Sequence, residues 1–267
     1  MHKVKISDIS IGHYLKLFGR SAMFLASLGL YLTGRLAEEL LRDFIAAKIF
    51  TLFVWAVFMA EMLMKYFPLG FESMGCQKQF ACNYIPAENS NAVSEKELRR
   101  YDRSALHILL LWILLNGTIA VLHFTGIIDR GVLMLISLLY SVSDMICILF
   151  FCPFQTLFMK NKCCITCRIY TWDYMMMFTP LLLIRSFFTW SLCAVALGLT
   201  LRWEYVYRKH PERFSEKTNK SLHCSSCREQ LCTHKKQLRS FHKKINFRRI
   251  TEKHIHKSDD RIHNQAR

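Results

Sequence analysis

The sequence predicts an all-α protein, a polytopic membrane helix bundle of about four transmembrane helices with an N-terminal interfacial helix and a basic cytoplasmic tail. The 267-residue chain is 52% apolar yet contains 36 Lys and Arg residues. The two kinds of residue occupy different stretches, because residues 202–267 hold 18 of the basic residues and residues 105–159 hold only Arg130. Basic blocks therefore flank apolar spans, and membrane sidedness explains the net charge of +16 more simply than nucleic-acid binding does.

The predicted spans are stretches of 20 or more mostly apolar residues, the length that crosses a hydrocarbon core about 30 Å thick. Tryptophans and tyrosines lie near most of their ends, as in an aromatic belt. The four spans are residues 44–67, 105–126, 131–158 and 175–201, within a transmembrane region of residues 44–203. Pro180 comes early enough in the last span to be tolerated in its first turns.

The N-terminal segment, residues 1–43, contains a shorter apolar stretch at residues 21–34, SAMFLASLGLYLTG. Basic residues precede this stretch, as in a signal peptide, but no small-x-small cleavage pattern follows it. Its 14 residues are short for a span. We expect a helix that lies in the membrane interface or packs on the bundle, with a span or uncleaved anchor as the alternative.

The distribution of basic residues predicts the orientation. Outside the spans, the segment up to Asp43, the turn at residues 127–130 and residues 202–267 carry 6, 1 and 18 basic residues. The loops at residues 68–104 and 159–174 together carry 8. The positive-inside rule therefore predicts a multi-pass protein of the cell membrane with both termini in the cytoplasm and these two loops outside.

Ionisable residues inside the predicted spans are candidates for function, because charge is costly in a bilayer core. Asp144 lies midway along the third span, and Arg185 lies about ten residues into the fourth. These spans run antiparallel, so a rise of about 1.5 Å per residue places both side chains near the middle of the membrane, and we expect them to pair. Glu61 in the first span can join this network. The three residues form either a structural ion pair or the centre of a transporter.

The tail, residues 204–267, carries the first candidate metal site. Cys224, Cys227, Cys232 and His234 place four ligands within eleven residues. Such a set is enough for a closed tetrahedral zinc site, and cysteine thiolates also hold iron–sulfur clusters. Zinc or an iron–sulfur cluster is therefore the expected cofactor, and solvated thiols without a chemical role are the alternative.

A second cysteine cluster, Cys163, Cys164 and Cys167, directly precedes the fourth span. Cys164 and Cys167 form a CxxC motif, in which two thiols can share one metal ion or one disulfide. If both clusters lie on one side of the membrane, they can supply one shared site, with His223 as a further ligand. That arrangement requires a different sidedness, because one predicted span separates Cys167 from Cys224.

Cys76 and Cys82 lie in the predicted external loop at residues 68–104. Together with Cys164 and Cys167, they give the chain a layout similar to that of four-helix membrane thiol oxidoreductases of the DsbB and vitamin K epoxide reductase type. The resemblance implies a CxxC at a helix end that exchanges disulfides with a cysteine pair in an external loop, with a quinone nearby. The additional Cys163 and the tail cluster depart from that pattern.

Three functions are therefore considered. The leading one is a membrane sensor, regulator or assembly factor with a cysteine-ligated metal centre. The alternatives are a membrane thiol–disulfide oxidoreductase that uses the CxxC motif with the loop pair, and a small-molecule or ion transporter built on the three intramembrane charges. The expected partners are the bilayer and anionic lipid at the basic tail, where each charge near the surface contributes about 1 kcal/mol.

Overall fold

The computed structural model describes residues 8–33, 45–68, 75–87, 94–160, 163–164, 166–223 and 225. This part of the chain is helical and contains no strand. Its one β-type pairing is an isolated bridge between Pro86 and Asn219. The prediction of an all-α fold is confirmed for these residues.

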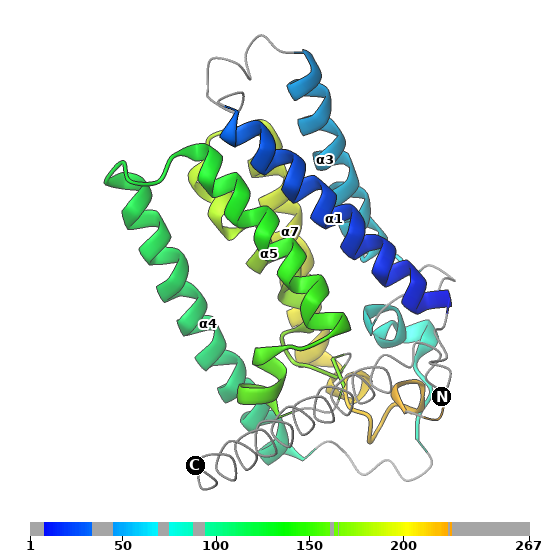
Figure 1. Cartoon of the computed structure of the whole chain (residues 1–267). Coiled ribbons are helices and arrows are strands. Elements are labelled where there is room, and N and C mark those ends of the chain that lie inside the picture. The colour runs from blue at the N-terminus through cyan, green and yellow to red at the C-terminus, as the bar shows by residue number, and fades with distance from the viewer. Residues whose placement is uncertain are drawn as a thin grey trace, which may run out of the picture.

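Five long helices form a bundle in the described part of the chain (Figure 1). α1 packs along α5, α3 packs on α7, and α4 stands at the edge of the bundle (Figure 1). The five helices are α1 (Asp8–Leu32), α3 (Ile45–Met64), α4 (Glu95–Phe124), α5 (Arg130–Leu149) and α7 (Phe187–Lys209).

Short helical segments connect the long helices. α6 and η5 follow each other directly and lie against α5 and α7. The short segments are η1 (Gly75–Gln79), η2 (Ala81–Asn83), the π-helix η3 (Phe154–Met159), η4 (Tyr170–Trp172), α6 (Asp173–Phe178), η5 (Thr179–Leu183), η6 (Pro211–Arg213) and η7 (Lys220–Leu222).

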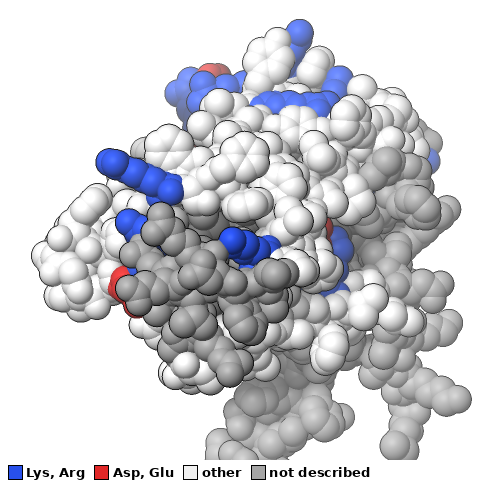
Figure 2. Space-filling model, turned by 90° about the horizontal axis from the view of Figure 1, so that it is seen from above, with Lys and Arg blue, Asp and Glu red and all other residues white. Residues whose placement is uncertain are grey.

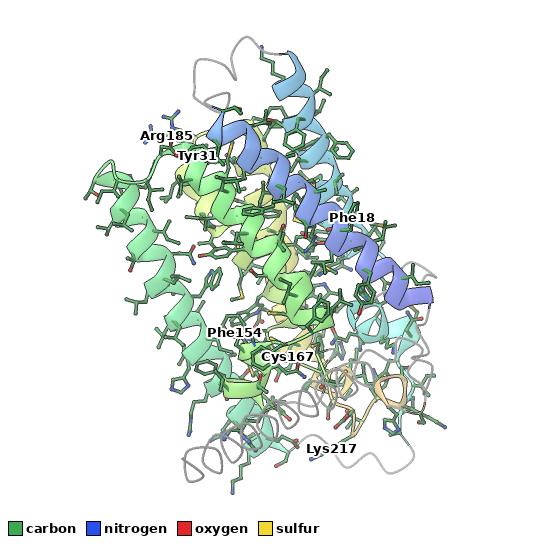
Figure 3. All side chains as sticks on the ribbon, viewed as in Figure 1. Phe18, Tyr31, Phe154, Cys167, Arg185 and Lys217 are labelled. Carbon is green, nitrogen blue, oxygen red and sulfur yellow. The ribbon has the colours of Figure 1, made fainter. Side chains whose placement is uncertain are left out.

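Three of the helices are long and apolar enough to cross a membrane, as judged by length and composition: residues 11–32 of α1, α4 and α5. Large apolar side chains cover their outer faces. Phe18 of α1 is 73% exposed (Figure 3), and Leu114 of α4 is 68% exposed. Apolar surface of this extent is unusual for a protein that is surrounded by water.

The main core joins α3, α6 and α7. Phe58 and Met62 of α3 are buried against Phe178 of α6, and Leu199 and Trp203 of α7 belong to the same cluster. The Phe58 and Phe178 rings meet edge to face with their centroids 5.3 Å apart. Such an aromatic pair contributes about 0.5–1.5 kcal/mol beyond the burial of its surface. The short α6 is therefore held by the long helices on both sides.

Two predicted spans are wrong as single helices. The span at residues 131–158 ends as an α-helix at Leu149 and is followed by Pro153 and η3. The span at residues 175–201 is divided into α6, η5 and α7, because Pro180 opens a 3₁₀ turn and Ile184 is extended. Proline lacks the amide hydrogen that a continuous helix requires, so the chain leaves the helix and begins α7 only after Ser186.

The two other differences are extensions. α4 begins ten residues before the predicted start, and Glu95 and Glu97 in its first turn suit the positive end of the helix dipole. α1 has 25 residues rather than the 14 of the apolar stretch. Its additional turns contain Lys16 and Arg20, whose charges are balanced inside the protein rather than by solvent, as described below.

The predicted separation of the tail from the two loops is wrong. The Ser221 hydroxyl donates a hydrogen bond to the Asn83 carbonyl at 2.7 Å, and the Lys220 amide donates to the Ile85 carbonyl at 2.8 Å. These contacts are possible because the chain crosses the molecule twice after Cys167. It passes through α6 and η5 to Arg185 and returns along α7 (Figures 1 and 3).

We call the end of the molecule that contains residues 75–87, 150–172 and 210–223 the basic end. Figure 1 shows it as the lower end, where α5 and α7 finish and α4 begins. The upper end contains the turn at residues 125–129 and the α7 start. Uncharged side chains make up most of that upper face, with scattered Lys and Arg (Figure 2).

Candidate thiol pocket at the basic end

Residues 210–223 are fastened to the loop that contains Cys82. Asn219 is fully buried, and its side-chain amide donates hydrogen bonds to the carbonyls of Lys78 at 3.2 Å and Arg213 at 2.9 Å. The Ala87 amide donates to the Thr218 carbonyl at 3.1 Å. A buried amide with both donors satisfied fixes the position of the backbone around it. The beginning of the tail therefore has a defined place beside η1 and η2.

Arg168 fixes the loop that contains Cys167. Its guanidinium donates two parallel hydrogen bonds to Glu204 of α7, at 2.5 and 2.6 Å, and one to Asp102 of α4 at 3.0 Å. It also lies 3.8 Å from the centroid of the Tyr207 ring. Burial alone would lower the pKa of Arg168, but the hydrogen bonds and charge of Glu204 outweigh burial and raise it. The loop is thus tied to two helices by a cation that does not titrate.

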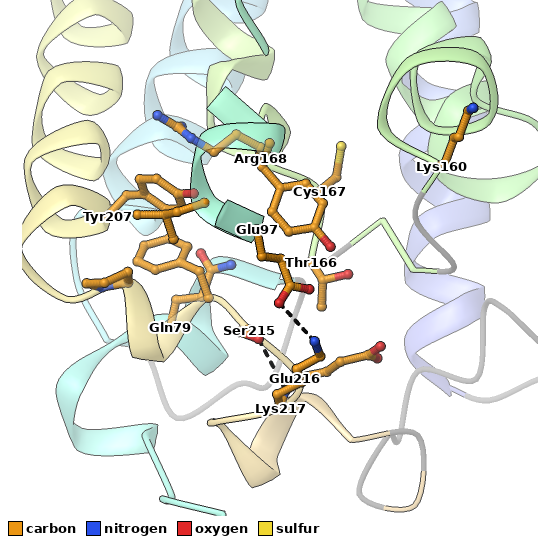
Figure 4. A pocket seen from close by; sticks show the side chains of 14 residues that line it. Gln79, Glu97, Lys160, Thr166, Cys167, Arg168, Tyr207, Ser215, Glu216 and Lys217 are labelled. Carbon is orange, nitrogen blue, oxygen red and sulfur yellow. Dashed lines mark hydrogen bonds and ion pairs between the residues drawn. The ribbon is translucent and has the colours of Figure 1, made fainter. Parts of the chain in front are cut away.

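A pocket of about 170 Å³ lies where these segments meet (Figure 4). Gln79 reaches it from the loop between Cys76 and Cys82, Thr166 and Cys167 from the CxxC loop, and residues 215–217 from the beginning of the tail. The loop between Cys76 and Cys82, the CxxC loop and the stretch that precedes the tail cysteines therefore border one pocket, and Cys167 is the cysteine among its lining residues. Across its mouth, the Lys217 ammonium donates a hydrogen bond to Glu97 at 2.8 Å (Figure 4).

Cys167 is the thiol that lines this pocket. Burial raises the pKa of Cys167 to about 12, although a hydrogen bond with the Ile169 backbone offsets part of the effect. The group is therefore a neutral thiol at neutral pH and a weak nucleophile. A bound metal ion reverses this situation, because a coordinated thiol loses its proton.

Cys167 also lines a second cavity, of about 300 Å³, between α4, α5 and α6. Figure 3 shows Cys167 near Phe154, below the end of α5. This inner cavity is lined by four thiols, two carboxylates and several large apolar groups. They include Cys147, Cys152, Cys164, Cys167, Asp144, Asp173, Trp112, Tyr140, Met176 and Met177.

A network of charges lies beside the inner cavity. The Arg20 guanidinium of α1 donates hydrogen bonds to Glu61 at 2.8 Å and to Asp144 at 3.0 Å. Lys16 lies 3.3 Å from Glu61, and the Tyr174 hydroxyl donates to the same carboxylate at 3.0 Å. Glu61 and Asp144 thus belong to one network, but its cation comes from α1.

The predicted pair of Asp144 with Arg185 is therefore wrong. Arg185 is exposed, between η5 and α7, at the end of the molecule opposite Cys167 (Figure 3). The prediction assumed one continuous helix from residue 175, which would have placed Arg185 near mid-membrane. Because the chain crosses the molecule within α6 and η5, Arg185 reaches the far end instead.

A second, largely buried pair completes the network, because Lys65, which directly follows α3, bonds to Asp173 of α6. The described network then contains three cations and three carboxylates. Its groups are Lys16, Arg20, Lys65, Glu61, Asp144 and Asp173. The net charge of the network is zero, and charges that are paired in this way cost less free energy to bury than an unpaired charge does.

The other predicted site residues differ in their exposure and in whether the structure describes them. Cys163, Cys164 and Cys167 are half-buried, and Cys82 is exposed. Cys76 is the second residue of η1, but its side chain lies outside the described part of the structure. His223 caps the end of η7. Cys224, Cys227, Cys232 and His234 lie outside the described residues.

Among the described residues, no three or more His, Cys, Asp and Glu side chains are arranged to hold a metal ion. Sequence reasoning missed Cys147, Arg20, Lys65 and Asp173 as members of the two sites. The spacing of Cys147 and Cys152 around the end of a span was a usable signal for the thiols. Nothing in the sequence pairs Arg20 with Asp144 across 124 positions.

Comparison with known proteins gives no family. No protein-family model matches the chain. No curated protein matches it, and no solved structure does. What the chain does must therefore be inferred from the pocket, the inner cavity and their residues.

Proposed function

We propose that the chain is a multi-pass protein of the cell membrane in which α1, α3, α4, α5 and residues 187–201 of α7 cross the bilayer, with the α6–η5 segment as the short return. The apolar length of α1, α4 and α5 and their exposed outer faces support this proposal. The basic end lies in the cytoplasm, together with both termini, and its charges contact anionic lipid.

The sidedness has a direct test. Single-cysteine variants in a background without other cysteines are labelled in intact cells with a membrane-impermeant maleimide. Positions in the loop at residues 75–87 and in the tail stay protected, whereas a cysteine in the turn at residues 125–129 is labelled. Labelling of the loop with protection of the tail would contradict a shared side.

On this cytoplasmic side the protein holds a cysteine-ligated metal centre, zinc or an iron–sulfur cluster, and acts as a sensor, regulator or assembly factor. One observation carries this proposal: the loop between Cys76 and Cys82, the CxxC loop with Cys167 and the stretch that precedes the tail cysteines border a single pocket. The tail supplies Cys224, Cys227, Cys232 and His234, and the CxxC loop supplies further thiolates. Four such ligands form a closed structural zinc site, and four thiolates hold an iron–sulfur cluster.

The test is the metal content of the protein purified in detergent under reducing conditions, together with its absorbance spectrum. We expect about one zinc per chain or a visible iron–sulfur band. The double variant Cys224→Ser/Cys227→Ser loses the metal. The matched control is Cys193→Ser, because Cys193 is buried among the helices, away from the pocket. A metal-free wild type would remove the proposal.

A thiol–disulfide oxidoreductase is the second candidate function. It is favoured by the convergence of Gln79, from the loop between Cys76 and Cys82, and Cys167 on the same pocket. In this candidate, the pair Cys164 and Cys167 exchanges a disulfide with the loop pair. Cys164→Ser or Cys167→Ser then traps a mixed disulfide with a client, which a non-reducing gel detects. Unchanged thiol status in both variants would contradict it.

A transporter receives no such support. Asp144 and Glu61 are both bonded to Arg20, and Arg185 lies at the other end of the molecule. A neutral network in which one guanidinium joins three helices is what a packing element requires. We therefore assign these charges to the stability of the bundle, and this assignment is tested in the Discussion.

A further inference from the structure

The end of α5 holds a pair of thiols that the proposed metal centre does not use. Cys147 lies in the last turn of α5, and Cys152 lies three residues after the helix ends. The side chains of Cys147 and Cys152 are neighbours on the wall of the inner cavity. The backbone amide of Gln155 donates a hydrogen bond to the Cys152 sulfur at 3.4 Å. A sulfur that accepts hydrogen bonds is stabilised in its thiolate form.

The break in the helix explains how the two thiols meet. In a continuous α-helix, residues five apart are separated by about 7.5 Å along the axis, more than a disulfide tolerates between its Cα atoms. α5 ends at Leu149, and Phe150 leaves ideal helical geometry with φ −115° and ψ −67°. Pro153 cannot donate the backbone hydrogen bond that would extend α5, and it instead stands at the N-cap of η3. The chain between Leu149 and Pro153 therefore turns Cys152 back toward Cys147.

The surroundings provide access and a third thiol. Both cysteines are partly exposed and line the inner cavity of about 300 Å³. The Cys164 thiol lies beside them and donates a hydrogen bond to the Gln155 side-chain carbonyl at 3.1 Å. A structural pair of thiols would need neither the open cavity nor a neighbouring thiol. By contrast, Cys193 is buried, and its thiol donates to a backbone carbonyl at 3.4 Å.

We propose that Cys147 and Cys152 form a reversible disulfide in the inner cavity by exchange with a small-molecule disulfide. The Cys152 thiolate attacks one sulfur of the reagent and releases its other half as a thiol. The Cys147 thiolate then attacks the Cys152 sulfur of this mixed disulfide and releases the second half. The chain loses two electrons and two protons, and both appear in the two thiols released.

The test equilibrates the full-length protein in detergent micelles with mixtures of reduced and oxidised glutathione. Free thiols are then alkylated, and the protein is digested with trypsin. Cys147 and Cys152 are the only cysteines between Arg130 and Lys160, so they share one tryptic peptide. We expect this peptide to lose two hydrogens as the mixture becomes more oxidising, along a two-electron curve, and to regain them on reduction.

Two variants identify which sulfur attacks the reagent and which sulfur completes the disulfide. In Cys147→Ser the Cys152 thiol retains bound glutathione, because the second attack is missing, and in Cys152→Ser no oxidised form of Cys147 appears. The Cys193→Ser control behaves as the wild type. The proposal is overturned if the wild-type peptide stays fully alkylated where the exposed Cys82 is already glutathionylated, or if Cys152 pairs with Cys164 instead. Metal content of the same samples is a separate readout, so failure of the metal centre leaves this result standing.

Discussion

Arg20 and Arg168 do the same task in different surroundings. Each guanidinium joins two carboxylates from two different helices. The Arg20 side chain is 6% exposed and bonds to Glu61 and Asp144, which are 11% and 22% exposed. The Arg168 side chain is 7% exposed, but its partner Asp102 is 50% exposed. The inner cation therefore meets only protein, whereas the outer one shares a partner with water.

The difference indicates what each arginine is for. In the inner network, removal of one ion leaves its partners buried and unpaired, and the cost is large. At the basic end, water can replace a lost partner, so the same geometry contributes less to stability. The role that remains for Arg168 is positional, because it holds the loop with Cys167 against α4 and α7. We therefore expect Arg20 to govern folding and Arg168 to govern the thiol pocket.

The largest expected effect is that of Arg20→Leu. This change leaves the Asp144 carboxylate buried without its cation, and Glu61 keeps only Lys16 and Tyr174. The free energy of unfolding should fall by about 3–5 kcal/mol, the usual cost of breaking a buried ion pair. Denaturation of the purified protein in mixed micelles measures it.

The control for this change is Lys16→Ala, because Lys16 pairs with Glu61 but is 35% exposed. It should cost much less. If Arg20→Leu proved as stable as Lys16→Ala, the inner network would not be the packing element that we infer. If Arg20→Leu lost an ion-transport activity while its stability stayed unchanged, the transporter would again be a candidate function.

A smaller effect is expected for Arg168→Ala. The variant loses three charge-assisted hydrogen bonds, but one is to the half-exposed Asp102, so we expect a loss of about 1–2 kcal/mol. Because the loop is released, Cys167 should react with a maleimide several-fold faster. The matched control is Lys217→Ala, whose exposed pair with Glu97 borders the same pocket. If the rate at which Cys167 reacts with the maleimide were unchanged in Arg168→Ala, Arg168 would not control the thiol pocket.

The smallest effect is a dependence on pH at Glu204. Burial alone would raise the pKa of Glu204, but the hydrogen bonds and charge of Arg168 outweigh burial and lower it. A carboxylate whose pKa is lowered in the folded protein stabilises the fold above its ordinary value of 4.5 and loses this contribution as the pH falls through the folded pKa.

The difference in melting temperature between the wild type and Glu204→Gln should therefore be present at pH 7 and shrink below pH 4.5. Thermal unfolding in detergent across this range measures it. A difference that grows on acidification would mean that the carboxylate is protonated in its bond with Arg168.

The sequence was a good guide where one property decides the structure. Apolar length predicts α4 and the helical part of the third predicted span, α5, because an apolar run of about 20 residues is typical of a membrane-spanning helix. Sequence failed where distant residues decide. The α1 helix includes Arg20 because Glu61 and Asp144 neutralise it, and no local pattern reveals that. The division of residues 175–201 depends on Pro180 and on the core contacts of Phe178, which a hydropathy average hides.

The same division misled the reading of the thiol sites. A single span before the tail would place Cys167 and Cys224 on opposite sides of the membrane. In the structure the chain crosses the molecule through α6 and η5 and then returns along α7 to the end where it started. The pocket could therefore not be predicted, although each of its cysteine-bearing segments was recognised. Cys147 was missed because a cysteine inside an apolar helix resembles any other small apolar residue.

Cys167 borders both the pocket and the inner cavity, and this position has a thermodynamic consequence. A metal ion that takes the Cys167 sulfur from the pocket side also removes a thiol from the cavity wall. Occupancy of the pocket and the redox state of the cavity are then linked, and the coupling free energy is the same in both directions. Oxidation inside the bundle would then change the metal affinity of the pocket at the basic end, over the width of one side chain.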